Sequence, residues 1–119
     1  RSSMAWAEPR PDRRVPARLR PLSDVEAAWL GAFFDAEGTV IREDDGRKYR
    51  LKVVNTEVEF LSAFLRLTGI GSLWFKPRQE PHHMDGYVWG ITARNDVEAF
   101  VEALRPYSLK VRLVDYSTV

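Results

Sequence analysis

Apolar stretches separated by polar turns run along the chain, and the signals that frame the longer stretches predict three helices. Each begins at a residue that can cap a helix, with a glutamate three positions later, in the pairs Ser23 with Glu26, Thr56 with Glu59 and Asn95 with Glu98. The predicted helices cover residues 23–36, 56–68 and 95–105. Gly69 and Pro106 follow the second and third, because glycine favours a helix terminus and proline cannot continue a helix.

The shorter stretches between the helices predict two β-hairpins. Residues 39–44 and 47–54 flank a turn at Asp44-Asp45-Gly46, and residues 71–77 and 86–93 flank a longer polar connection. Residues 107–119 are ambiguous, with a short helix preferred. The order helix, hairpin, helix, hairpin, helix predicts an α+β fold of the form αββαββα, with the helices on one face of an antiparallel sheet.

The second predicted strand carries its charge on one face. Side chains alternate across a strand, so Tyr49, Leu51 and Val53 are expected to face the helices, and Lys48, Arg50 and Lys52 to share the outer face. Three like charges on one face favour contact with a polyanion, because lysine and arginine bind phosphates and base edges of DNA. A solvated basic face, or an edge strand guarded by lysine, is the alternative.

Length and composition narrow the class of protein. The 119 residues suffice for one core, and we expect a basic arm rich in proline and arginine over residues 1–22, followed by one domain over residues 23–119. No apolar run approaches the ~20 residues that cross a membrane, so no membrane partner is expected. The absence of cysteine excludes disulfides and fits a reducing intracellular location, in the cytoplasm or an organelle. The net charge of +1 argues neither for nor against binding to nucleic acid.

The end of the first predicted helix holds the most unusual residues. Residues 29–38 read Trp-Leu-Gly-Ala-Phe-Phe-Asp-Ala-Glu-Gly, so that two acids, Asp35 and Glu37, precede the glycine that ends the helix. Negative charge opposes the dipole at the C-terminal end of a helix. The pair therefore indicates a site, and an ordinary amphipathic helix with a glycine stop is the alternative.

This run resembles the LAGLIDADG motif of the homing endonucleases. Leu30 matches the leading leucine, Gly31-Ala32 matches Ala-Gly in swapped order, Phe33-Phe34 matches the two apolar positions, and Asp35-Ala36-Glu37-Gly38 matches Asp-Ala-Asp-Gly. The resemblance extends over residues 24–113, although its specific part is confined to residues 29–38 and Asn55. It implies a saddle-shaped four-stranded sheet that binds double-stranded DNA. It also implies a staggered, Mg²⁺-dependent double-strand break in a long pseudo-palindromic site by an intron-encoded enzyme, with no small-molecule cofactor.

The resemblance also assigns roles at the cleavage site. Glu37 becomes a catalytic metal ligand, with its neighbour Ala36 as the second metal position, and Asn55 positions the hydrolytic water. Asn55 is equally suited to cap the helix that follows it. Lys110 becomes the cation that stabilises the transition state.

Two positions depart from the family pattern. The matching place after the third helix is Val111 rather than Lys110, and a second basic position after the asparagine is acidic here, at Glu57 and Glu59. His82 and His83 lack the ligand spacing of a zinc site and are expected in a solvated loop.

A single motif implies a homodimer, as in other single-motif members of the family. Small residues at helical spacing allow two helices to approach closely, and the predicted interface consists of Ala28, Gly31, Ala32 and Asp35. Packing of this face against another helix of the same chain is the alternative. Trp29, Leu30, Phe33 and Phe34 then remain for the core.

The outer sheet face is expected to contact DNA, through Ile41, Glu43, Lys48, Arg50, Lys52, Ser72, Trp74 and Lys76. Two other functions stay open. One is a non-cleaving DNA-binding regulator or RNA-splicing maturase of the same fold, which the altered basic positions favour. The other is a protein-interaction module that binds an acidic partner through the sheet.

Overall fold

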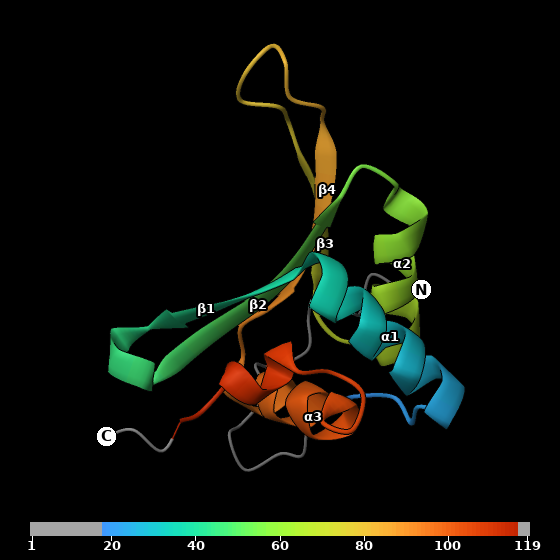
Figure 1. The fold of residues 1–119 in the computed structure, drawn as a ribbon, viewed down its shortest axis with the longest axis vertical. Helices are drawn as coiled ribbons and strands as arrows, with labels where there is room; N and C mark the ends of the chain where they lie inside the picture. Colours follow the sequence, from blue (N-terminus) through green and yellow to red (C-terminus); the bar gives the residue numbers. More distant parts are fainter. Residues whose placement is uncertain (1–17, 117–119) are drawn as a thin grey trace, which may run out of the picture.

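Three helices cover one face of a four-stranded antiparallel sheet in the computed structural model of the protein, which describes residues 18–116 (Figure 1). The sheet order is β1-β2-β4-β3. The elements along the chain are α1 (Asp24–Glu37), β1 (Gly38–Glu43), β2 (Lys48–Asn55), α2 (Val58–Thr68), β3 (Ser72–Lys76), β4 (Gly86–Ile91) and α3 (Arg94–Leu104), followed by a short 3₁₀ turn (Lys110–Leu113). The predicted α+β fold and its αββαββα order are confirmed.

The first predicted capping box is confirmed and the other two are wrong. At α1 the Glu26 amide donates to Ser23 Oγ (3.1 Å), and the Ser23 amide donates to Glu26 Oε1 (2.9 Å). Helix α2 begins only at Val58, because the chain first turns at Glu57, and α3 begins directly after Ala93, which places Asn95 inside the helix. Neither helix has a side-chain cap.

The sheet separates a packed face from an open one. Tyr49, Leu51 and Val53 are buried beneath the helices, as predicted. Trp89 lies at the centre of the core, with its ring 5.0 Å from that of Phe64, and its indole nitrogen donates to a backbone carbonyl at 3.0 Å. The tryptophan thereby satisfies its polar atom while it contributes a large buried surface.

Only half of the motif helix's large side chains belong fully to the core. Leu30 and Phe34 are completely buried, whereas Phe33 is half-buried and Trp29 is 37% exposed. The expectation that all four belong to the core is therefore wrong for Trp29. Gly38 is required at the helix end because any added Cβ would overlap the Phe34 ring.

The packed domain extends back to Leu19, which lies with Leu22 against the core. The Arg20 amide donates to the carbonyl oxygen of Thr68 at 2.9 Å, which joins this segment to the end of α2. The remainder of the predicted arm lies outside the described residues. Within residues 18–116, every helix is too short or too polar to cross a lipid bilayer.

Two tryptophans on opposite faces of the sheet test this division. Trp89→Ala is expected to lower the free energy of unfolding by about 3–5 kcal/mol, because it leaves a cavity in the core. Trp74→Ala removes a ring that is 48% exposed and should cost less than about 1 kcal/mol. Urea denaturation of both variants measures the difference, and equal losses would contradict the assignment of the two faces.

Candidate active site

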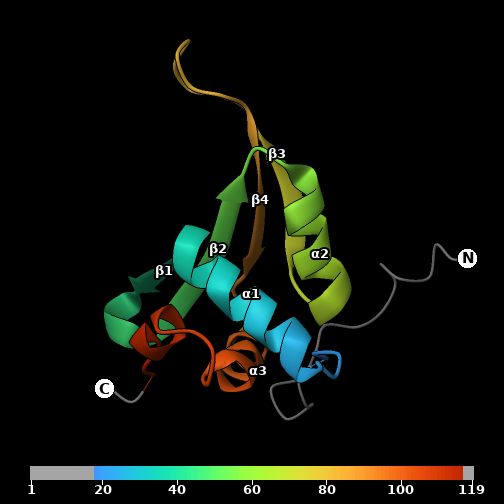
Figure 2. The ribbon, with the colours of Figure 1, turned by 45° about the vertical axis from the view of Figure 1, so that its right-hand side comes forward.

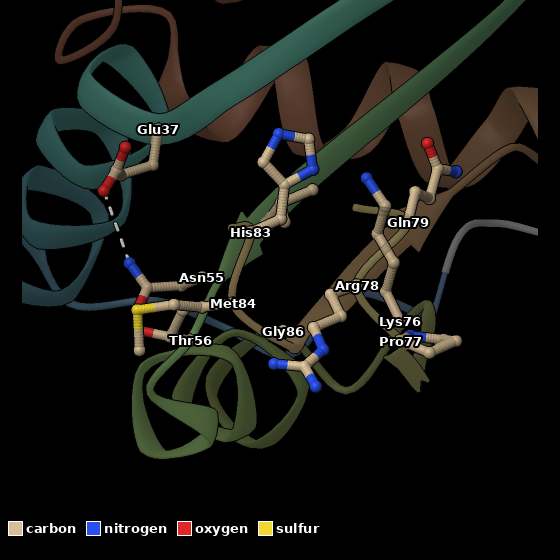
Figure 3. A pocket seen from close by; sticks show the side chains of 11 residues that line it. Glu37, Asn55, Thr56, Lys76, Pro77, Arg78, Gln79, His83, Met84 and Gly86 are labelled. Atoms are coloured by element: carbon tan, nitrogen blue, oxygen red, sulfur yellow. Dashed lines mark hydrogen bonds between the residues drawn. The ribbon is translucent and has the colours of Figure 1, made fainter. Parts of the chain in front are cut away.

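One end of the sheet brings together chain segments that are distant in sequence. Register pairs Gly38 with Val53, Asn55 with Tyr87, and Lys76 with Gly86, so the end of α1 lies near the ends of β2 and β3 and the start of β4. The Asn55 side-chain amide donates to Glu37 Oε1 at 3.3 Å (Figure 3). Two of the predicted catalytic residues are therefore in direct contact.

Asn55 also shapes the chain that follows it. Its Oδ1 accepts a hydrogen bond from the Glu57 amide at 2.8 Å, which holds the turn that precedes α2. Asn55 therefore fulfils both roles considered for it: its oxygen holds the turn before α2, and its NH₂ group contacts the candidate site. Because the carbonyl oxygen is held by the turn, the NH₂ group is fixed toward Glu37.

Asp35 binds the segment that follows α3. Its carboxylate accepts hydrogen bonds from Ser108 Oγ (2.6 Å), the Leu109 amide (2.9 Å) and the Lys110 amide (3.0 Å). Burial of the carboxylate opposes its ionisation, but these three bonds and the positive charge of Lys110 outweigh it and leave the pKa of Asp35 below its ordinary value. The first acid of the motif is thus a structural anchor.

Lys110 lies beside the residue that follows Glu37. Its ammonium donates to the carbonyl oxygen of Gly38 at 2.7 Å. Helix α1 has no basic residue in its last turn, so Lys110 supplies from a distant segment the cation that the helix dipole favours there. Val111 is completely buried and cannot reach the site.

The surface of α1 differs from the predicted small-residue stripe. Gly31 faces the chain's own C-terminal segment, because a Cβ there would lie 2.8 Å from the backbone oxygen and the Cβ of Tyr107. Asp35 bonds to the same segment, Ala28 is half-buried, and of the predicted set Ala32 alone is exposed. The structure thus corrects which positions of this helix are free to meet a second subunit.

The residues that α1 does expose form another stripe. Val25, Trp29, Ala32 and Ala36 are exposed at spacings of four, three and four, which places them on one helix face. Phe60 of α2 borders this face, with its ring 5.1 Å from that of Phe33. Tyr107 and Leu109 border the other side, and Leu109 is 69% exposed. We call this region the apolar α1 surface.

The residues predicted to contact DNA share the outer face of the sheet. Register aligns Ile41 with Arg50 and Glu43 with Lys48, and it places Lys52, Gly90 and Ser72 in one row. Trp74 and Lys76 follow Ser72 on the same face by alternation. The basic strand is not free of acid, since Glu43 on the neighbouring strand forms an ion pair with Arg50 at 3.2 Å.

A cavity of about 430 Å³ opens beside Glu37. Asn55 borders it on one side, and the other side is bordered by Lys76 at the end of β3 and by Arg78 and His83 of the β3–β4 connection (Figure 3). Sequence analysis did not assign Arg78 or His83 to a site. The polar and basic character of their connection was the available signal, but a loop sequence does not show which way the loop folds.

Among the described residues, the candidate site offers a single exposed carboxylate for a metal. Within residues 18–116 no three histidine, cysteine, aspartate or glutamate side chains gather closely enough to hold an ion. Glu37 is exposed, Ala36 beside it offers only backbone oxygen, and Asp35 is engaged elsewhere. This donor set fits Mg²⁺, which commonly takes one or two carboxylates and completes its shell with water and substrate phosphates.

The fold has clear counterparts among solved structures. No family model and no curated protein sequence matches the chain. The homing endonuclease I-CvuI, in complex with its target Sro1.3, matches with a TM-score of 0.55 at 19% identity, over 76% of this chain and 63% of I-CvuI. The fold is that of a homing endonuclease.

Two further homing endonucleases share the fold. I-CeuI complexed with DNA has a TM-score of 0.53 at 14% identity, over 76% of this chain and 47% of I-CeuI. The archaeal intron-encoded I-Vdi141I complexed with DNA has a TM-score of 0.52 at 19% identity, over 71% and 56%. The present chain spans less than two thirds of each of these proteins.

The anchoring role of Asp35 predicts a pH-dependent loss of stability. Asp35→Asn should lower the free energy of unfolding by about 1–2 kcal/mol near neutral pH, because charge-assisted bonds to the C-terminal segment are lost. Since folding lowers the pKa of Asp35, its contribution is present above the ordinary value of 3.8 and disappears as the pH falls through the lower folded value.

Urea denaturation between neutral pH and about pH 3 measures this effect. The difference between wild type and Asp35→Asn should be constant above about pH 5 and shrink below about pH 4. Glu59→Gln, an exposed acid on α2, is the matched control and should stay within about 0.5 kcal/mol of wild type. A variant as stable as wild type at neutral pH would exclude the anchor.

Proposed function

We propose that this protein is a Mg²⁺-dependent DNA endonuclease of the homing type that acts as a homodimer. The observation that carries the proposal is the exposed Glu37 at the end of α1, held by Asn55 and adjoining the carbonyl that Lys110 binds. A catalytic carboxylate, a water-positioning amide and a cation thus meet at one end of a basic sheet. These three groups come from separated segments of the chain that the fold brings together.

The sheet supplies the DNA-binding surface in this proposal. Its outer face carries Lys48, Arg50, Lys52 and Lys76 and lies opposite the core. A basic β-surface can enter the major groove, where arginine and lysine contact base edges and phosphates. The exposed Glu43–Arg50 ion pair is worth at most about 1 kcal/mol, so DNA can displace it readily.

A second copy of the chain is the proposed partner of the apolar α1 surface. The small side chains of Ala32 and Ala36 permit two α1 helices to pack closely, while Trp29 and Phe60 supply buried area. A two-fold axis through this surface uses the same patch on both subunits. Because Glu37 follows Ala36 directly, the axis would bring two glutamates close to each other and to one DNA site.

The proposed reaction is hydrolysis of a phosphodiester bond in each strand. Mg²⁺ held by Glu37 and the Ala36 carbonyl would activate water and neutralise phosphate charge. Asn55 orients the attacking water through the side-chain N–H that does not bind Glu37, since the turn fixes the oxygen of the same amide. The water oxygen bonds to phosphorus and gives up a proton to solvent, while a phosphorus–oxygen bond of the backbone breaks and its oxygen leaves with the bonding electrons and takes up a proton. Lys110 has donors beyond the one that binds Gly38, and these can stabilise negative charge on the phosphate.

A non-cleaving DNA-binding protein of the same fold is the second candidate. The burial of Val111 and the acids Glu57 and Glu59 favour it, because both basic positions implied by the family resemblance are missing. This candidate retains the sheet surface and the dimer but lacks the hydrolytic step.

The role of Glu37 predicts that its charge is needed for cutting and not for binding. Wild type should nick a supercoiled plasmid library in the presence of Mg²⁺, and Glu37→Gln should reduce the rate by at least about 10²-fold. Salt-sensitive binding of a DNA duplex should survive the change.

Agarose gels and fluorescence anisotropy separate the outcomes. Glu102→Gln, a remote exposed acid on α3, should behave as wild type in both assays. Duplex binding without nicking by the wild type at any Mg²⁺ concentration would select the second candidate. Absence of duplex binding at low salt would reject both.

If the apolar α1 surface forms the dimer interface, one charged side chain introduced there should prevent dimerisation. Ala32→Arg should shift the molecular mass from dimer to monomer, because burying an unpaired guanidinium in the interface is costly. Sedimentation equilibrium measures the mass, and circular dichroism checks that the fold is retained. Glu102→Arg places the same charge on exposed α3 and should leave the dimer intact. A wild type that is monomeric with and without DNA would contradict the proposed assembly.

A further inference from the structure

The connection between β3 and β4 extends beyond the end of the sheet, on the side where α1 ends (Figure 2). Two hydrogen bonds join residues within this connection. The Arg78 amide donates to Asp85 Oδ1 at 2.8 Å, and the His83 amide donates to the Glu80 carbonyl at 2.9 Å. The bond to the Asp85 carboxylate and the backbone bond to Glu80 give the connection a defined turn in which the Arg78 guanidinium takes no part, and the His83 ring packs edge-on against the His82 ring with centroids 4.2 Å apart.

The connection lines the same cavity as the candidate catalytic residues. Glu37 and Asn55 border the cavity from the ends of α1 and β2, and Arg78, His83 and Lys76 border it from the connection and β3 (Figure 3). Glu37 is the one acid among these lining residues. Among residues 18–116, no ion pair holds the side chain of Lys76 or Arg78.

Phosphodiester cleavage needs positive charge that the usual positions do not provide here. The resemblance implies basic residues shortly after Asn55 and after α3. This chain has exposed acids at Glu57 and Glu59 in the first place and a fully buried Val111 in the second. Lys110 lies next to the site, but one of its N–H donors binds the carbonyl oxygen of Gly38. The two cationic side chains that line the cavity, Lys76 and Arg78, both come from the β3 side.

We propose that Arg78 and His83 bind the phosphate that is cut, so that the β3–β4 connection completes the cleavage site from the side opposite Glu37. This rests on the proposed function. Arg78 offers a guanidinium that matches two phosphate oxygens at once, and His83 offers a ring N–H donor. DNA that lies on the outer sheet face would place its backbone in the cavity, between the metal-binding carboxylate and these donors.

The test compares cutting with binding in the intact protein. Supercoiled plasmid library with Mg²⁺ is the cleavage probe, and a fluorescent duplex of random sequence is the binding probe. The double substitution Arg78→Gln and His83→Gln should lower the nicking rate at saturating protein by about tenfold or more, since donors aimed at a reacting phosphate act mainly on the chemical step. The dissociation constant of the duplex should change by less than about threefold. Arg78→Lys should recover part of the rate, because a cation remains.

The matched control comes from outside the loop. Arg105→Gln removes an exposed arginine that directly follows α3 and does not line the cavity, so this variant should nick at the wild-type rate.

Three results would overturn the inference. Nicking by the double variant at the wild-type rate, while Glu37→Gln abolishes it, rejects the loop's role and leaves the proposed function intact. Equal losses of nicking and of duplex affinity reassign the loop to general DNA binding. A wild type that never nicks removes the proposed function and this inference together.

Discussion

The hydrogen bonds between Asp35 and residues 108–110 join the two ends of the domain. A carboxylate in the last turn of a helix opposes the dipole, and it is stable here because a hydroxyl and two backbone amides donate to it. These bonds draw the segment after α3 against α1. As a consequence Lys110 lies at the Gly38 carbonyl, and Glu37, two residues after Asp35, is left exposed at the edge of the domain. The two acids of the motif therefore have opposite tasks, one inside the fold and one outside it.

The sheet divides the molecule into a packed side and an open, charged side. Alternation along β2 sends Tyr49, Leu51 and Val53 into the core and the basic residues to the other face. The helices occupy the core side, so the charged side remains open (Figure 1). Trp74 lies on that open side across Gly90, where an added Cβ would lie 3.2 Å from the indole. A half-exposed ring on a basic face is compatible with contact to bases, and its place over the sheet depends on the missing side chain of Gly90.

A single subunit is chemically incomplete under the proposed function. Glu37 is one carboxylate, and among the described residues no group of three acids, histidines or cysteines gathers to hold a metal ion. The apolar α1 surface, which ends at Ala36, offers a physical reason for two copies to meet at that point. The second carboxylate would then come from the other copy. The β3–β4 connection would add positive charge from within each subunit.

Much of the fold could be predicted from the sequence because its determinants are local. The Ser23 capping box, the turn at Asp44-Asp45-Gly46 and the alternation in β2 depend on neighbours within a few residues, and the structure contains all three. The boxes at Thr56 and Asn95 failed for a related reason. Each satisfies the spacing rule, but the chain turns elsewhere, at Asn55–Glu57 in one case and at Ala93 in the other.

The sequence by itself determined the order of elements, the two faces of the sheet and the position of Glu37 at a helix end, since these follow from residue type and spacing. Only the tertiary structure decided which face of α1 is free. Helical spacing groups Gly31 with Ala32, but packing against Tyr107 buries the first and leaves the second exposed. The same holds for Lys110 and for Arg78, whose places near Glu37 depend on contacts between segments far apart in the chain, which no local pattern records.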